Sequence, residues 1–71
     1  MARKPRLANR IRELRAEHGA MTQAQLGIAI GVTRQTVIAI EQNRYSPSLE
    51  SAFRIARHFE VGLEEVFSWV D

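Results

Sequence analysis

The sequence predicts an all-α domain built from five short helices, and three features lead to this prediction. Apolar residues recur three and four positions apart through most of the chain, the spacing that places them on one side of a helix. Residues that favour helix ends separate these stretches at short intervals. The 71 residues suffice for one domain and are too few for two. We therefore expect one compact domain over residues 7–71, preceded by a basic arm over residues 1–6.

The first helix is expected over residues 7–18. Leu7, Ile11 and Leu14 recur there at helical spacing among charged side chains. Gly19 follows as the residue that ends the helix. No strand is expected in this part of the chain.

The next two helices have explicit start and stop signals. Thr22 and Gln25 match a capping box, in which each side chain bonds the other residue's backbone N–H. Gly31 ends this helix. Thr33 caps the helix that follows, which ends near Gln42. Only two residues separate the helices, so their connection must be a tight turn.

The C-terminal third of the chain predicts two more helices. Ser48 is the cap of the fourth, whose apolar stripe is expected to form one buried face. Gly62 and Glu65 occupy the cap and capping-box positions of the fifth. The stripe of the fourth helix consists of Leu49, Ala52, Phe53, Ala56 and Phe59.

Charges are distributed unevenly along the chain. Residues 1–44 hold eight Lys and Arg against three Asp and Glu, a balance of +5; residues 45–71 hold two against five, a balance of −3, and the sum is the net +2. A basic half of this kind suits a polyanionic partner. The absence of cysteine fits a reducing cytoplasm. No apolar run is long enough to predict a membrane span.

The residue patterns that enzymes and metal sites require are not recognisable. His18 and His58 are far apart in the sequence, with no cysteine or clustered carboxylates beside them. There is no nucleophile–base set, phosphate-binding glycine loop or pair of carboxylates that would form a catalytic cleft. We therefore expect neither an enzyme nor a bound metal or cofactor.

Residues 23–42 meet the local requirements of a helix-turn-helix, in which two helices pack at a steep angle through a short turn. Gly27 is the small residue where the helices cross, and Gly31 supplies the turn. Two glycines alone would not predict this motif, but the surfaces through which the two helices would pack are apolar as well. The residues of these surfaces are Leu26, Ile30, Val32, Val37 and Ile40.

Residues 22–26, 31–37 and 45–50 resemble the Xre-like family of phage repressors and Cro proteins, which have a lambda-repressor-like DNA-binding domain. The resemblance extends from about residue 7 to residue 67. It implies a bacterial, archaeal or phage-derived regulator that binds double-stranded DNA. The departures from the family pattern are an extra residue between Gly19 and Thr22, Gln42-Asn43 where Asn-Gly is commoner, and apolar Ile38-Ala39.

The first turn of the third helix is expected to reach base edges in the major groove. Arg34 can pair with both major-groove acceptors of guanine, and Gln35 can pair with adenine. Ala39 lies on the same side of the helix as Gln35. It either contacts a thymine methyl group or is a neutral helix residue.

Phosphate contacts are expected on both sides of that helix, where they would set its register without reading sequence. The resemblance implies that the start of the second helix faces a phosphate, which suits the exposed amides of a helix N-terminus. The basic arm either is disordered or contacts the minor groove or phosphates. The expected backbone contacts are Gln23, Thr33, Thr36, Asn43, Arg44 and Tyr45.

The resemblance also implies an internal ion pair between Arg15 and Glu41. Glu41 falls on the core side of the third helix, where an unpaired carboxylate would be costly. Pairing with Arg15 would join the first helix to the end of the third.

A second copy of the chain is expected, because one recognition helix contacts few base pairs and two-fold dimers bind palindromic operators. The expected interface is the apolar C-terminus, as a short strand or as a helical face. The alternative is that these side chains complete the core. They are Val66, Phe67, Trp69 and Val70.

Three functions remain open on the sequence. The first is a transcriptional regulator, expected to be a repressor. The second is an antitoxin-like protein that regulates its own gene and also holds a partner protein. The third is an interaction scaffold that uses the fold without DNA. A DNA affinity that falls steeply with salt would exclude the third.

Overall fold

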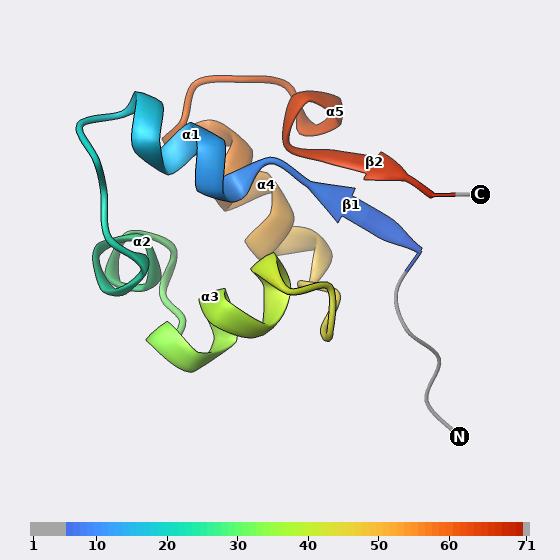
Figure 1. Cartoon of the computed structure of the whole chain (residues 1–71), viewed down its shortest axis with the longest axis horizontal. Coiled ribbons are helices and arrows are strands. Elements are labelled where there is room, and N and C mark those ends of the chain that lie inside the picture. The colour runs from blue at the N-terminus through green and yellow to red at the C-terminus, as the bar shows by residue number, and fades with distance from the viewer. Residues whose placement is uncertain (1–5, 71) are drawn as a thin grey trace.

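Figure 1 shows a computed structural model of the chain. The structure describes residues 6–70, which form five helices around one core. The predicted five-helix domain is confirmed, with a small two-stranded sheet joining the two ends of the described chain. The helices are α1 (Ile11–Glu17), α2 (Gln23–Ile30), α3 (Arg34–Glu41), α4 (Leu49–His58) and α5 (Leu63–Val66), and the strands are β1 (Leu7–Asn9) and β2 (Phe67–Trp69). The predicted arm, apart from Arg6, lies outside the described residues.

The sheet corrects the prediction for the first helix, which begins at Ile11 and not at Leu7. β1 and β2 pair antiparallel, with Leu7 opposite Trp69. Beyond the strands, the N–H of Arg10 donates to the carbonyl of Val66 at 2.9 Å. Residues 7–9 therefore form their backbone hydrogen bonds with a segment that is distant in the sequence. The spacing of apolar residues within 7–18 does not reveal these bonds.

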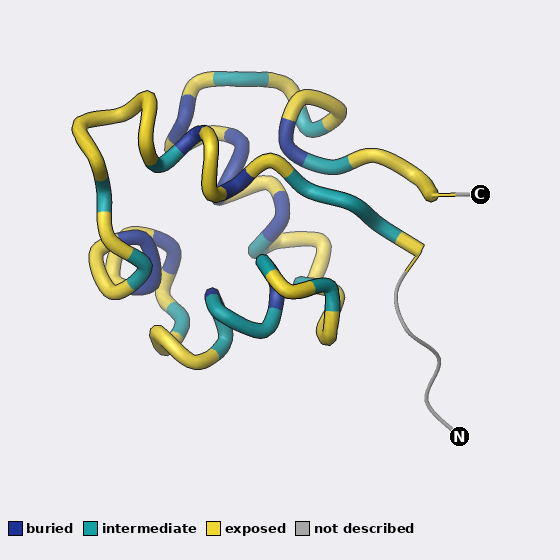
Figure 2. The backbone as a smooth tube through the Cα atoms, in the orientation of Figure 1, coloured by how far each residue is buried: buried dark blue, intermediate teal, exposed yellow. Residues whose placement is uncertain are grey.

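The core lies between the helices, as the buried stretches in Figure 2 show. α4 contributes a face that differs from the predicted one: Leu49 and Phe53 are exposed, and Ile55 is buried instead. Residues 52, 55, 56 and 59 form the buried stripe at helical spacing, and Leu49 and Phe53 lie to one side of it. The core cluster consists of Ile11, Leu14, Leu26, Ile30, Val37, Ile40, Ile55, Ala56, Phe59 and Val66.

The C-terminal apolar residues divide between the core and the surface. The sequence places Val66 at a dimer interface, but only 1% of Val66 is exposed, because α5 directs its side chain into the core. Phe67 is half-buried against the same core. Trp69 and Val70 are exposed. Val66 is thus unavailable to a second copy.

The predicted helix starts are confirmed by their hydrogen bonds. The Thr22 hydroxyl accepts from the N–H of Gln25 at 3.0 Å, and the Gln25 side chain accepts from the N–H of Thr22 at 2.8 Å. The Thr33 hydroxyl caps α3 by accepting from the N–H of Thr36 at 3.1 Å. Ser48 caps α4 in the same way. The start of each of these helices is therefore fixed by residues close to it in sequence.

The close connection between α2 and α3 depends on two glycines. Gly31 has a φ of +79°, a left-handed conformation that glycine adopts at the least cost. Gly27 lies where the turn and the start of α3 cross α2, and a Cβ there would stand 2.8 Å from the carbonyl oxygen of Val32. Asn43, with a φ of +58°, follows the end of α3 as predicted.

Replacing Gly27 with alanine is expected to lower the free energy of unfolding by about 1–3 kcal/mol, because the added methyl group must displace the Val32 backbone. The sign is informative, since alanine in place of glycine in an open helix ordinarily raises stability by roughly 0.5–1 kcal/mol. Urea denaturation followed by circular dichroism measures the change. A variant as stable as the parent would show that the two helices do not approach closely at this point.

Candidate nucleic-acid interface

α3 turns one side to the core and the other to the outside. Val37 and Ile40 are buried, whereas Arg34 and Gln35 in its first turn are exposed. Neither of these two exposed side chains forms a hydrogen bond or an ion pair within residues 6–70. Ala39 is half-buried farther along the helix and offers less surface. The first turn of α3 is therefore free to meet an outside partner.

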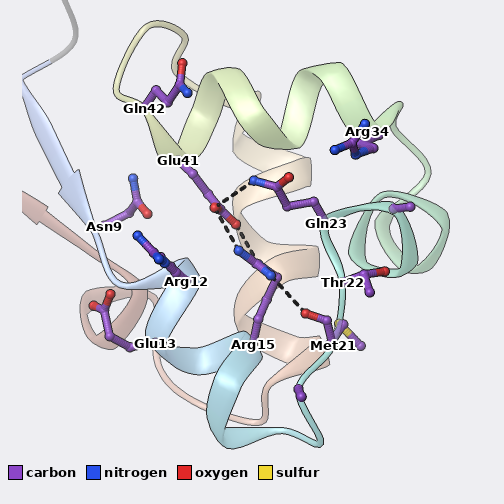
Figure 3. Close-up of a pocket in the computed structure, with 12 residues that line it drawn as sticks. Asn9, Arg12, Glu13, Arg15, Met21, Thr22, Gln23, Arg34, Glu41 and Gln42 are labelled. Carbon is purple, nitrogen blue, oxygen red and sulfur yellow. Dashed lines mark hydrogen bonds and ion pairs between the residues drawn. The ribbon is translucent and has the colours of Figure 1, made fainter.

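A bidentate ion pair holds the far end of α3 against α1. Arg15 Nε donates to Glu41 Oε2 at 2.7 Å, and Arg15 Nη2 donates to Glu41 Oε1 at 3.0 Å. Arg15 also donates to the carbonyl of Met21 at 2.9 Å, and the Gln23 amide donates to Glu41 at 3.2 Å (Figure 3). The Arg15 and Glu41 side chains are only 15% and 9% exposed. One carboxylate thus ties α3 to α1, and to α2 through Gln23.

The same carboxylate changes the expected role of Gln23. The Gln23 side chain is half-buried and directed at Glu41, so it helps to hold α3 in place. The start of α2 still borders open space, because Thr22 and Ala24 line a cleft together with Gln23. A phosphate contact at this point would therefore use the helix backbone more than the Gln23 amide.

This cleft is open, has a volume of about 880 Å³ and lies between α1, the start of α2 and α3 (Figure 3). Arg12 enters it from α1 and Arg34 from α3, while Arg15 and Glu41 neutralise each other at its wall. Sequence reasoning did not assign a role to Arg12. Its position three residues before Arg15 was an available signal, since residues three apart share one side of a helix. The cleft thus places a further cation beside α3.

Asn9 connects the sheet to the end of α3. Its side-chain Nδ2 donates to the carbonyl of Ile40 at 3.0 Å and to the side-chain oxygen of Asn43 at 3.3 Å. Its Oδ1 accepts from the N–H of Ile11 at 3.2 Å. Sequence reasoning missed this residue because the contact requires β1, which local spacing did not predict. Asn9 therefore holds the start of α1 in place, and it also holds Asn43, a candidate contact to the DNA backbone.

The other expected backbone contacts lie at the two ends of α3. Thr33 and Thr36 are at its start, with their hydroxyl oxygens 3.0 Å apart in a hydrogen bond. Asn43, Arg44 and Tyr45 follow its end, and the last two are exposed. The candidate contacts to the DNA backbone therefore lie both at the start of α3, beside Arg34 and Gln35, and beyond its end.

Two features of the described part of the chain bear on metal binding and on membrane insertion. Residues 6–70 contain no cluster of three or more carboxylate, imidazole or thiol side chains that could hold a metal ion. The His18 and His58 rings pack instead beside Phe59, with centroids 5.0 and 5.3 Å from it. Within the same residues, no helix has the length and apolar character of a membrane span.

An exposed helix held against a second helix by a glycine turn, with arginine and amide side chains on its outer face, defines a DNA-binding helix-turn-helix domain. A helix-turn-helix family model matches residues 11–66 of the chain. The chain therefore belongs to the helix-turn-helix family of the Xre/Cro type, which is a family of DNA-binding transcriptional regulators and not an enzyme family.

Several relatives agree with this assignment. The chain is 45% identical over 65 residues to an uncharacterized HTH-type transcriptional regulator of Methanocaldococcus jannaschii, with 92% of this chain and 97% of the relative covered. It is 46% identical over 65 residues to the uncharacterized HTH-type transcriptional regulator YgzD of Bacillus subtilis, covering 92% and 96%. The cryptic phage CTXphi transcriptional repressor RstR of Vibrio cholerae is 33% identical over 61 residues, covering 86% of this chain and 54% of RstR.

A solved structure shows the same fold. It is that of a candidate DNA-binding protein from Bacteroides fragilis, with a TM-score of 0.75, and the match covers 87% of this chain and 98% of the other. The two sequences are 24% identical. At this level the likeness supports the arrangement of the helices.

Proposed function

We propose that this helix-turn-helix regulator reads a specific sequence in double-stranded DNA by placing the first turn of α3 in the major groove. The observation that carries the proposal is the state of Arg34 and Gln35. Both are exposed and unpaired within residues 6–70, while the opposite side of the same helix is fixed by Val37, Ile40 and the ion pair of Glu41. A rigid helix with a free polar first turn is what base recognition requires.

The proposed contacts to the DNA backbone would lie on both sides of α3. On one side Arg12 and the start of α2 line the same cleft, where the cation and the helix amides both favour a phosphate. On the other side Arg44 and Tyr45 are exposed beyond the end of α3, and Asn43 is held there by Asn9. Arg12 is thus added to the contacts expected from the sequence. Contacts of this type position the helix and leave base recognition to Arg34 and Gln35.

We further propose that the regulator is a repressor that binds a palindromic operator as two copies. The similarity to RstR, named as a transcriptional repressor, supports the sign of regulation. Two-fold binding follows from the small number of base pairs that one recognition helix can contact. Half-sites about 34 Å apart are then expected.

Salt dependence of DNA binding tests the proposed phosphate contacts. Replacing Arg12 or Arg44 with alanine is expected to weaken binding on every duplex and to reduce the slope of log K against log salt by roughly one for each phosphate that the variant no longer neutralises. Fluorescence anisotropy of labelled duplexes measures this slope. Between about 50 and 200 mM salt, phosphate contacts change the DNA affinity strongly.

The matched control for these variants is Arg57→Ala, which removes another exposed arginine from α4, outside the cleft. Its slope should equal that of the parent. An unchanged slope in both Arg12→Ala and Arg44→Ala would remove these residues from the interface. A parent protein with no salt-dependent affinity for DNA would contradict the proposed function itself.

An antitoxin-like role is the alternative, and it is favoured by the exposed apolar side chains of α4 and β2, which suit a protein partner. In that case DNA binding would regulate the protein's own gene, and a different protein would cover these side chains. Purification from the native cell would then yield a complex of defined stoichiometry that dissociates when Trp69 is replaced by serine.

A further inference from the structure

Two asparagine side chains meet at the end of α3, Asn9 on β1 and Asn43 just beyond the helix. Asn9 Nδ2 donates to Asn43 Oδ1 at 3.3 Å and to the carbonyl of Ile40 at 3.0 Å. Asn9 lies between the start of α1 and the end of α3 (Figure 3). We call Asn9 and Asn43 the asparagine pair. Because a carboxamide has a donor end and an acceptor end, the direction of each side chain determines what it offers to an outside partner.

Backbone groups fix the direction of the Asn9 side chain. The N–H of Ile11 can only donate, so the end of the Asn9 carboxamide that faces it, at 3.2 Å, is the oxygen. The carbonyl of Ile40 can only accept, so the end that faces it is the nitrogen. Turning the carboxamide over would break both bonds. The sheet keeps Asn9 in this place, because Asn9 pairs with Phe67 of β2.

The direction of Asn9 in turn fixes that of Asn43. Both protons of Asn9 Nδ2 are engaged, one by Ile40 and one by Asn43, so Asn43 must present its oxygen to Asn9. Asn43 Nδ2 has no acceptor within residues 6–70. Solvent reaches this nitrogen, because no buried side-chain nitrogen or oxygen of the same residues is without a partner. Its N–H groups are therefore offered to the outside.

This donor changes what the end of α3 presents to an anion. A helix C-terminus carries unpaired carbonyls and the negative end of the helix dipole, which disfavour an anion. Here the carbonyl of Ile40 accepts from Asn9 Nδ2 and from the N–H of Asn43, at 3.1 Å, and the carbonyl of Ala39 accepts from the N–H of Arg44 at 2.9 Å. Beyond these paired carbonyls, Asn43 offers its amide and Arg44 its exposed side chain. Both groups donate, as phosphate oxygens require.

We infer that Asn9 is a positioning residue for DNA binding, which turns the Asn43 carboxamide so that its nitrogen faces a phosphate of the DNA backbone. The inference rests on the proposed function and deepens it, because it gives β1 a role in a contact that is made at the end of α3. A phosphate fits this place because its oxygens accept hydrogen bonds and its charge is opposite to that of Arg44. Asn9 acts through Asn43 and sets the direction of its amide.

A double-mutant cycle on DNA affinity tests the inference. Asn43→Gly removes the phosphate donor and keeps the left-handed backbone, which glycine adopts at the least cost. It is expected to weaken binding to a selected duplex about tenfold for each copy bound, the effect of one hydrogen bond to a charged group. Asn9→Ser removes the donor to Asn43 but keeps a hydroxyl that can accept from the N–H two residues later. It is expected to weaken binding about threefold or more, because the Asn43 amide is then free to turn.

The coupling between the two changes separates positioning from a purely structural role. If Asn9 acts through Asn43, Asn9→Ser should lose its effect on DNA affinity in the Asn43→Gly background. An equal loss of affinity in both backgrounds would show that Asn9 only stabilises the fold, and would overturn the inference. The matched control is Ser68→Ala, which removes an exposed polar side chain from the other strand of the sheet. Its affinity should equal that of the parent.

Duplexes in which one phosphate is replaced by a neutral methylphosphonate identify the partner of Asn43. At the contacted phosphate the replacement should weaken binding of the parent about tenfold and cost little in Asn43→Gly or Asn9→Ser. At every other phosphate the variants should respond as the parent does. If no phosphate behaves in this way and Asn43→Gly changes the bases selected from random duplexes, Asn43 contacts a base edge and the inference is wrong.

Exchange of the side-chain amide protons with water, followed by NMR on the parent, tests the direction of the asparagine pair without any substitution. In the free protein the Asn9 protons should exchange slowly and the Asn43 protons rapidly. Addition of the selected duplex should slow the exchange of the Asn43 protons. The opposite order in the free protein would overturn the inference, and this measurement replaces the cycle if Asn9→Ser loses its helical circular dichroism.

The affinity of the parent for DNA separates a failure of this inference from a failure of the proposed function. A parent without salt-dependent affinity for duplex DNA would contradict the function. A parent that has this affinity, with Asn43→Gly binding equally well, would overturn the inference alone.

Discussion

Replacement of Arg15 with alanine is expected to lower the free energy of unfolding by about 3–5 kcal/mol, more than any other single change proposed for this chain. The substitution leaves the Glu41 carboxylate largely buried, with the Gln23 amide as its remaining side-chain donor. It also removes the donor to the Met21 carbonyl. A domain of this size has a stability at the low end of about 5–15 kcal/mol, so much of the variant should be unfolded at 37 °C.

Urea denaturation measures this effect, and Arg12→Ala is the matched control. Arg12 lies on the same helix, one turn earlier, but is exposed and forms no ion pair within residues 6–70. Its replacement should change the stability by no more than about 0.5 kcal/mol. Replacing Arg15 and Glu41 together with apolar residues should recover much of the loss, because no charge is then left buried. Equal melting midpoints for Arg15→Ala and the parent would contradict the structural role of the pair.

Replacement of Arg34 with alanine is expected to abolish discrimination at one base pair of each half-site, a loss of about 1–3 kcal/mol or roughly 5- to 150-fold. The reason is that no other side chain of the first turn can donate two hydrogen bonds to guanine. Gln35→Ala should have the corresponding effect at an adenine. Selection of bound sequences from random duplexes, carried out with the parent and each variant, measures the preference at every position.

Arg57→Ala serves as the control for this selection, since it removes one positive charge from α4 outside the cleft. Its selected sequences should be those of the parent. If Arg34→Ala and Gln35→Ala weaken binding equally on every duplex, the two side chains contact phosphates and the base readout lies elsewhere. Loss of preference confined to one or two positions supports direct readout.

The sequence predicted those parts of the fold that depend on neighbouring residues. The caps at Thr22, Thr33 and Ser48 each require one hydroxyl and an amide three residues later, and all three are present. The turn at Gly31 requires a left-handed backbone within a two-residue connection, which glycine signals directly. Local chemistry was therefore sufficient to predict α2, α3 and their connection.

Contacts between distant segments were not predictable in the same way. The β1–β2 pair joins residues about sixty positions apart, so nothing near Leu7 indicates it. Asn9 acquires its role only once this pair exists, because its partners Ile40 and Asn43 lie 31 and 34 positions away in the sequence. The side of α4 that is buried depends on how the helix packs against the rest of the domain, so helical spacing alone predicts Phe53 in the core where the structure has Ile55.

The extra residue that the resemblance predicts between Gly19 and Thr22 would fall in the connection between α1 and α2. Gly19 and Ala20 both have positive φ values, +77° and +54°, so two consecutive residues of this connection are left-handed. The N–H of Met21 then donates to the carbonyl of Arg15 at 3.0 Å. This connection ends directly before α2, and the capping box at Thr22 is intact.

The most direct test of base reading by α3 is the reactivity of guanine N7, which lies in the major groove, toward methylation by dimethyl sulfate on a selected duplex. The parent is expected to protect one guanine in each half-site, and Arg34→Ala, at a concentration that gives equal occupancy, is expected to leave that guanine reactive. A bound parent protein that leaves every guanine N7 as reactive as in free DNA would contradict the account.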